Sequence, residues 1–172
     1  EEQGVVPDII TMAKGMGNGQ PLGAVITRRG IAEALEAEGY FFSSAGGSPV
    51  SCQIGMAVLD VMEEEKLWEN AQVVGGHFKA RLEALIDRHP LVGAVHGSGF
   101  YLGLELIRNR ETLEAATEET ALLCDRLREL GIFMQPTGDD LNILKIKPPM
   151  VTSRRSVDFF VDMLDRVLTE GL

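Results

Sequence analysis

The chain has 172 residues, of which 45% are hydrophobic and 24% charged, a composition typical of a globular protein and unlike that of disordered or fibrous chains. A domain near this size buries roughly 70% of the surface that its unfolded chain exposes, so the length allows one domain or two small ones with a hydrophobic core. With 26 acidic and 16 basic side chains the formal net charge is −10, which argues against nucleic-acid binding because that function requires a basic surface.

The sequence also bears on the cellular compartment of the protein and on whether it binds a metal ion. No apolar run approaches the roughly 18 residues that cross a bilayer, and the first residues resemble neither a signal peptide nor a transit peptide. The two cysteines indicate no disulfide framework, and the three histidines lack metal-ligand spacing. We therefore expect a cytoplasmic protein that has no membrane partner, no nucleic-acid partner and no metal.

The first third of the chain predicts two strands, a loop and two helices. Short apolar, β-branched runs at 5–12 and 22–27 predict buried strands. The glycine-rich segment 13–21 between them predicts a tight loop, and residues 31–38 predict a brief amphipathic helix. Ser48 and Pro49 then have the types expected at the N-cap and first turn of a further helix, which runs to about Met62.

The remainder of the chain predicts three helices and three strands. Apolar residues spaced by threes and fours from Leu67 predict a helix that ends at His89 and Pro90. Alternating apolar residues predict a strand over 100–106, after a turn at 97–99. A helix ending at Gly131, strands over 132–135 and 142–147, and a last helix from Thr152 or Ser153 follow.

Lys14 is the first candidate for chemistry. It directly follows a predicted strand and directly precedes alternating glycines, so its amine lies at the edge of the predicted core beside backbone that a ligand can approach. Such a setting can lower the pKa of a lysine, which suits a Schiff-base nucleophile, whereas the ordinary alternative is a solvated lysine at a strand end. A dinucleotide-binding loop is excluded because Pro21 and a strand follow the glycines, and a phosphate-binding P-loop because the lysine precedes them.

Residues 7–25, PDIITMAKGMGNGQPLGAV, resemble the lysine motif of the class III aminotransferases, which are pyridoxal-phosphate-dependent enzymes of fold type I. The resemblance implies an α/β fold: residues 1–62 would form the C-terminal part of the large cofactor-binding domain, and residues 63–172 the small α+β domain with its long connecting helix. It also implies that Lys14 forms a Schiff base with pyridoxal 5'-phosphate and moves a proton between substrate and cofactor.

A second block, residues 40–52, is similar to the family segment that reaches the cofactor phosphate of the other subunit. Ser44 falls at the position of a threonine whose hydroxyl makes that contact, and Ala45 follows it. The resemblance therefore implies a homodimer in which Ser44 and Ala45 bind the partner's cofactor. The alternative is that this segment serves only to cap the following helix.

A third block, residues 142–150, narrows the choice within the family. Many members have, at the position of Lys145, an arginine that binds a substrate carboxylate, and a lysine lacks the planar fork of that group. The longer run from Leu144 through Val167 is most similar to the branch of phospho-lyases that act on phosphoethanolamine or phosphohydroxylysine. The alternative for Lys145 and Lys147 is simple alternation on an exposed strand face.

The resemblance covers essentially the whole chain but only the C-terminal portion of the family's length. We expect a fragment of a pyridoxal-phosphate-dependent aminotransferase-like enzyme that acts on a primary amine or an amino acid. Phosphate elimination from a phospho-amine and a non-catalytic binding domain are the alternatives. The isolated fragment is expected to be inactive, because the family's phosphate-binding helix and the carboxylate that pairs with the pyridine nitrogen precede this segment.

Overall fold

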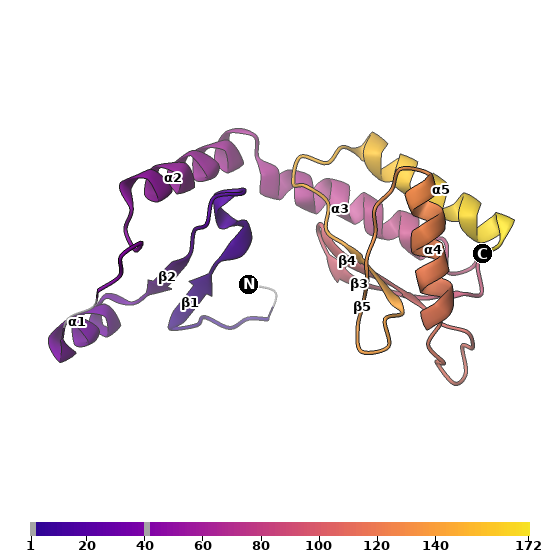
Figure 1. The fold of residues 1–172 in the computed structure, drawn as a ribbon, viewed down its shortest axis with the longest axis horizontal. Helices are drawn as coiled ribbons and strands as arrows, with labels where there is room; N and C mark the ends of the chain where they lie inside the picture. The colour runs from indigo at the N-terminus through magenta and orange to yellow at the C-terminus, as the bar shows by residue number, and fades with distance from the viewer. Residues whose placement is uncertain (1–2, 40–41) are drawn as a thin grey trace. The chain divides into compact units, whose positions relative to one another are not determined.

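The computed structural model describes residues 3–39 and 42–172, which form two compact units, Glu1–Glu65 and Lys66–Leu172 (Figure 1). The division falls three residues after the boundary expected between 62 and 63. Tyr40 and Phe41, with which the second sequence block begins, lie outside the described residues. Each unit is described by itself below.

The first unit holds a two-stranded antiparallel sheet and two helices. Strands β1 (Ile9–Met12) and β2 (Ala24–Thr27) pair with Ile9 opposite Thr27 and Met12 opposite Ala24. A single 3₁₀ turn, η1 (Lys14–Gly17), follows β1, and helices α1 (Arg29–Glu38) and α2 (Pro49–Glu64) complete the unit. Ser48 caps α2 by accepting a hydrogen bond from the Ser51 amide, and Pro49 occupies its first turn, as the sequence predicts.

The prediction that these two strands are buried is wrong within this unit. Ile9 is 53% exposed and Val25 is 67% exposed, and Gly17 is the only residue of the unit that is buried among those the structure describes. The cause is that α2 packs mainly on η1, so neither face of the small sheet receives a full cover. The composition of these strands suits burial on both faces, which this unit alone does not supply.

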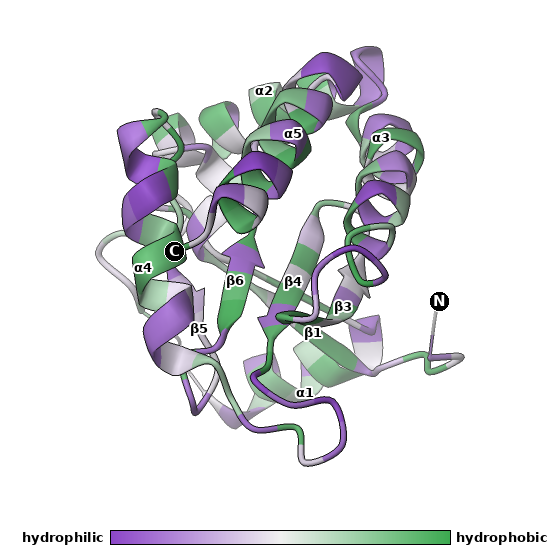
Figure 2. Ribbon diagram, turned by 90° about the vertical axis from the view of Figure 1, so that its right-hand side faces the viewer, coloured by the Kyte–Doolittle hydropathy of each residue, from purple (hydrophilic) through white to green (hydrophobic). Residues whose placement is uncertain are grey.

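The second unit is a four-stranded antiparallel sheet covered by three helices. Strands β3 (Val92–Ser98), β4 (Tyr101–Leu106), β5 (Pro136–Thr137) and β6 (Ile143–Ile146) lie in the order β3-β4-β6-β5. Helices α3 (Leu67–Glu83), α4 (Thr117–Glu129) and α5 (Arg154–Glu170) lie over one side of the sheet (Figure 2). The other face carries no helix of this unit among the described residues.

The core of this unit lies between the sheet and its helices. Alternate residues of β4 and β6 point into it, and apolar residues spaced by threes and fours on the helices meet them. Its largest fully buried side chains are Leu82, Leu85, Leu102, Leu104, Leu106, Leu123, Leu127, Leu144 and Leu164. Burial of each such side chain contributes about 1.5–3 kcal/mol relative to exposure, so this unit has the core that the first unit lacks.

Three details of the second unit differ from the sequence-based prediction. Helix α3 ends at Glu83, because tight i→i+3 bonds to the Leu82 and Glu83 carbonyls replace helical ones before His89 is reached. Residues 132–135 form no strand, and the pairing with β6 comes from β5 instead. Strand β3 was not predicted, because Gly93 and Gly97 interrupt its apolar alternation.

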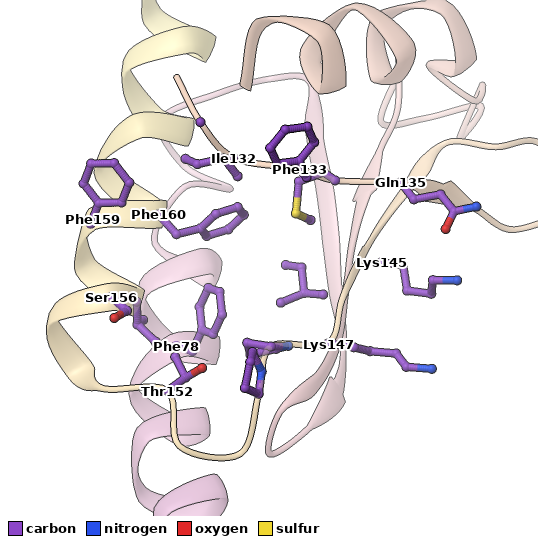
Figure 3. Close-up of a pocket in the computed structure, with 16 residues that line it drawn as sticks. Phe78, Ile132, Phe133, Gln135, Lys145, Lys147, Thr152, Ser156, Phe159 and Phe160 are labelled. Carbon is purple, nitrogen blue, oxygen red and sulfur yellow. The ribbon is translucent and has the colours of Figure 1, made fainter. Parts of the chain in front are cut away.

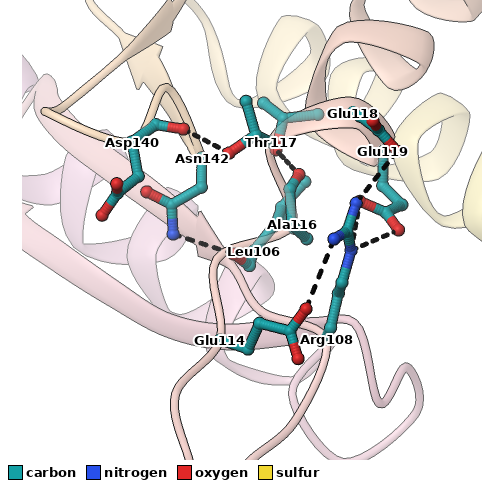
Figure 4. Close-up of polar contacts among 10 residues, drawn as sticks. Leu106, Arg108, Glu114, Ala116, Thr117, Glu118, Glu119, Asp140 and Asn142 are labelled. Carbon is teal, nitrogen blue, oxygen red and sulfur yellow. Dashed lines mark hydrogen bonds and ion pairs between the residues drawn. The ribbon is translucent and has the colours of Figure 1, made fainter.

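The entry to β6 is held by polar contacts from the preceding loop (Figure 4). The buried Asn142 side chain donates to the Leu106 carbonyl at 2.9 Å, and Thr117 donates to the Asp140 carbonyl. Arg108 lies nearby and bonds Glu114, Glu118 and Glu119. These contacts fix where β6 begins, and therefore which of its side chains face away from the helices.

Candidate functional site

Lys14 lies on the turn that connects β1 with β2. Its backbone has a φ of +60°, the left-handed region that costs a non-glycine residue roughly 1–2 kcal/mol. Lys66, Leu113 and Leu141 occupy the same region, so the backbone conformation alone does not single out Lys14. The side chain is exposed, and within the described residues its amine makes no hydrogen bond and no ion pair.

The turn that carries Lys14 is clamped to helix α2. The Gln20 side-chain amide lies 3.4 Å from the Ser51 hydroxyl, and Leu22 packs so close to Gly55 that a Cβ there would lie 2.7 Å from the Leu22 Cδ2 atom. Gly17 is buried at the base of the turn. Rigid helix contacts therefore hold the backbone of the lysine turn while the amine stays free.

The serine segment before α2 is a second place where a ligand can be held. The Ser43 hydroxyl accepts a hydrogen bond from the Gly46 amide at 2.9 Å, which folds the segment into a turn. Ser44 and Ala45 lie at the tip of this turn and are exposed, and the Ser44 hydroxyl makes no hydrogen bond within the described chain. A free hydroxyl and amide beside the N-terminus of a long helix suit an anion.

Lys145 lies on β6 in the second unit, directly opposite Gly103 of β4. Its neighbours Leu144 and Ile146 are buried against the helices, so the half-buried Lys145 points to the open face of the sheet. Lys147 follows on the same face, and its amine lies 4.8 Å from the centroid of the Tyr101 ring. Neither lysine makes an ion pair with any carboxylate in the part of the chain that the structure describes.

Two hollows adjoin this strand. A groove of about 760 Å³ lies on the helix side, among aromatic side chains that include Phe78, Phe159 and Phe160. In Figure 3 the side chains of Lys145 and Lys147 point away from these rings. A smaller hollow of about 230 Å³ lies over Gly103 and is lined by His96, Tyr101, Thr137 and Lys145, among others. Lys145 lines both hollows, whereas Lys147 is among the lining residues of the larger one.

Ion pairs shift the pKa values of several charged side chains in the second unit. The His77 hydrogen bond, with help from Arg81, lowers the pKa of Asp158. Burial raises the pKa of Asp165, but hydrogen bonds from His89 and Arg88 outweigh it and leave a net lowering. Hydrogen bonds to Glu119 and Glu114 raise the pKa of Arg108. These groups stabilise the second unit, and no cluster that could hold a metal ion exists among the described residues.

The residues present fit pyridoxal phosphate as far as this chain supplies the site. An unpaired amine on a strained, clamped turn suits covalent attachment to an aldehyde, and the free Ser44 hydroxyl with its neighbouring amide suits a phosphate. The sequence proposed Lys14, Ser44, Ala45 and Lys145 as candidates, and it gave no indication of Tyr101. Its position across from Lys147 depends on strand register, which the sequence does not state.

Comparison with known proteins extends these observations to the whole chain. Residues 1–168 match the sequence profile of the family described as aminotransferase class-III. The chain is 44% identical over 165 residues, 96% of its length, to alanine–glyoxylate aminotransferase 2 homolog 2 of Arabidopsis thaliana, a mitochondrial protein. It is 38% identical over 98% of its length to ethanolamine-phosphate phospho-lyase homolog 1 of Caenorhabditis elegans. It covers 34% and 36% of these two proteins, and thus spans about a third of their length.

Solved structures agree with the sequence matches. A phospholyase from Arthrobacter, solved in complex with phosphoethanolamine, superposes with a TM-score of 0.94 at 34% identity. The match covers 98% of this chain and 40% of that one. The fold is accordingly that of the C-terminal portion of a fold type I enzyme, and the family uses pyridoxal phosphate as its cofactor. The chain belongs to the class III aminotransferase family.

Proposed function

We propose that this chain is the lysine-bearing C-terminal portion of a pyridoxal-phosphate-dependent enzyme that acts on a primary amine or an amino acid, with Lys14 as the residue that binds the cofactor. One observation carries the proposal. The Lys14 amine is unpaired and exposed on a left-handed backbone turn, and helix α2 clamps that turn from behind. Lys66 has a left-handed backbone too, but its amine is paired with Glu69, so the combination of the clamped turn with an unpaired amine is what distinguishes Lys14.

Pyridoxal phosphate, when bound, supplies an electron sink that labilises bonds at the substrate carbon bearing the amine. Lys14 would hold the cofactor through Nζ and would also serve as the base that takes a proton from that carbon. The contacts with α2 fix the backbone of the turn from which Nζ would act in both roles. The main chain of the turn therefore positions the amine, and the lysine side chain moves the proton.

Ser44 and Ala45 are proposed to bind the phosphate of the cofactor held by a second copy of the chain, which makes the enzyme a homodimer. The free Ser44 hydroxyl and the N-terminal end of α2 support this role. A compartment that keeps thiols reduced, such as the cytoplasm, suits the two free cysteines, Cys52 and Cys124. Among the described residues no helix combines the length and the hydropathy needed to cross a membrane.

A labelling experiment on the full-length protein tests the assignment of Lys14. The protein is incubated with pyridoxal phosphate, reduced with borohydride, digested and mapped by mass spectrometry. We expect a pyridoxyl adduct on Lys14, lost in Lys14→Arg and retained in Lys66→Arg, a control lysine that forms a surface ion pair with Glu69. An unlabelled Lys14 in protein that has bound the cofactor would favour a non-catalytic binding domain instead.

A second candidate, elimination of phosphate from a phosphorylated amine, is favoured by Lys145. A substrate carboxylate is best held by the bidentate fork of an arginine, whereas Lys145 and Lys147 are two point charges that suit a phosphate. Lys145 is accordingly proposed to bind the anionic end of the substrate. Release of inorganic phosphate from phosphoethanolamine without a keto-acid acceptor would support elimination, and a strict need for the acceptor would support transamination.

A further inference from the structure

The open face of the sheet in the second unit has an unusual distribution of side chains. On β4 the residues that face away from the helices are Tyr101, Gly103 and Glu105, since Leu102, Leu104 and Leu106 are buried. On β6 and just beyond it they include Lys145 and Lys147. An aromatic ring, a glycine and a carboxylate therefore lie across from two lysines.

Tyr101 restrains Lys147. The Lys147 amine lies 4.8 Å from the ring centroid, within the distance at which a cation is attracted to the face of an aromatic ring. The Tyr101 side chain is 65% exposed, so the ring contributes little to the core. A free lysine loses up to roughly 2 kcal/mol of side-chain entropy when it is immobilised on a ligand. A ring that already holds the ammonium group reduces that loss.

Gly103 leaves room beside Lys145. It pairs with Lys145 on one side and with His96 on the other, and a Cβ at this position would lie 2.9 Å from the Ile143 Cγ2 atom. The hollow of about 230 Å³ over this glycine is lined by Lys145 and Tyr101 and is large enough for a phosphate group. Lys147 is not among its lining residues, but the Lys147 amine lies over the Tyr101 ring. Glu105, the carboxylate on this face, accepts a hydrogen bond from His96 at 2.6 Å and is thus occupied. Among the described residues, no carboxylate forms an ion pair with Lys145 or Lys147.

We propose that Tyr101 is a positioning residue that holds the Lys147 ammonium on the open sheet face, so that Lys147 and Lys145 together bind a doubly charged phosphate group. The inference rests on the proposed function, because it assigns the recognition of the substrate's anionic end. Tyr101 also lines the hollow, but its role in this scheme is exerted through Lys147 and not through its hydroxyl, which is why Tyr101→Phe is informative. The chain carries 26 acidic residues, so a pair of lysines without carboxylate partners is a local exception to its charge.

Lysine NMR measures this arrangement directly. The chain contains five lysines, and reductive methylation with ¹³C-formaldehyde gives each a separate dimethylamine signal while keeping its charge. The ring current of Tyr101 should move the Lys147 signal upfield of the others, with Lys147→Arg providing the assignment. That shift should disappear in Tyr101→Leu and persist in Tyr101→Phe, which keeps the ring. Phe133→Leu serves as the matched control, because this exposed ring lines the larger groove together with the two lysines, while the Lys147 amine lies over Tyr101 instead.

The second readout is the titration of each variant with inorganic phosphate, with acetate at equal ionic strength for comparison. We expect phosphate to shift the Lys145 and Lys147 signals, more than acetate does. The dissociation constant should rise about two- to fivefold in Tyr101→Leu, the equivalent of a cation–π contact at an exposed site, and stay unchanged in Tyr101→Phe and Phe133→Leu.

Each other outcome overturns the proposal. Tyr101 has no positioning role if the Lys147 signal is the same in the parent and in Tyr101→Leu, or if the two bind phosphate equally well. An equal response to acetate removes the selection for a doubly charged group, and a response of neither lysine removes the site. Because this experiment uses no cofactor, its result is independent of whether Lys14 is labelled by pyridoxal phosphate.

Discussion

Two adjacent glycines of helix α3 are predicted to respond in opposite directions to the same substitution. Gly75 is buried, and a Cβ built on it would lie 2.4 Å from the carbonyl carbon of Gly99 in the turn between β3 and β4. Gly76 is exposed, and a Cβ there would meet nothing within 4 Å. Of these two glycines, Gly75 is therefore the one at which the helix backbone lies against the backbone of the turn.

The magnitudes follow from two opposing effects. Alanine in place of glycine inside a helix gains about 0.8–1 kcal/mol of intrinsic propensity at either position. At Gly75 the added methyl group overlaps main-chain atoms, which cannot rotate away as a side chain can, so the cost is near the upper end of the overpacking range, about 3 kcal/mol. We expect Gly75→Ala to lower the free energy of unfolding by about 2 kcal/mol and Gly76→Ala to raise it by about 1 kcal/mol.

Urea unfolding followed by tryptophan fluorescence tests the pair. Trp68 is the single tryptophan of the chain and lies in the first turn of α3, so it reports on the second unit. An unchanged slope with shifted midpoints would show that the two variants alter stability rather than the unfolded state. The close approach of α3 to the β3–β4 turn is refuted if Gly75→Ala is as stable as Gly76→Ala.

Three further predictions concern the second unit. Since the pKa of Asp158 is lowered from its ordinary value of 3.8 in the folded state, its stabilising contribution is present above about pH 4 and is lost as the pH falls through the lowered value. Urea unfolding across acid pH should therefore show a flatter dependence in Asp158→Asn than in Asp139→Asn, at an exposed turn. Asn142→Leu removes the hydrogen bond to the Leu106 carbonyl and should lower the free energy of unfolding by about 1 kcal/mol. Ser153 caps α5 by accepting from the Ser156 amide, so Ser153→Ala should cost about 1 kcal/mol in thermal unfolding, whereas Ser153→Asp should cost little.

Helix α5 and helix α4 could be predicted from the sequence because their signals are local. Apolar residues at helical spacing, a serine N-cap and a glycine just past the end are read within a few residues of one another, and Ser153 and Gly131 are where the structure has them. Strand β5 could not be predicted in this way. It consists of Pro136 and Thr137, and what selects it over residues 132–135 is pairing with Leu144 and Ile143. Pairing across the chain leaves no periodic trace in so short a segment.

The candidate site shows the same contrast between local sequence signals and contacts between distant parts of the chain. Lys14 could be proposed from the sequence because its motif is contiguous, and the contacts of its turn with α2 add a physical reason that no motif contains. The expectation that its flanking strands are buried failed for a different reason. Apolar composition records what a strand contacts in the whole protein, and the first unit alone does not provide those contacts.

The two units therefore differ in how much of their proposed function can be tested on this chain alone. The second unit has its own core, and its open sheet face, with Lys145, Lys147 and Tyr101, is formed by the register of strands within that unit. The first unit has a clamped lysine turn but almost no buried residue. Anion recognition on the sheet can be measured on this chain because it depends on contacts that the chain contains. Covalent attachment of the cofactor at Lys14 must be tested in the full-length protein, because the apolar strands that carry the turn need partners to become rigid.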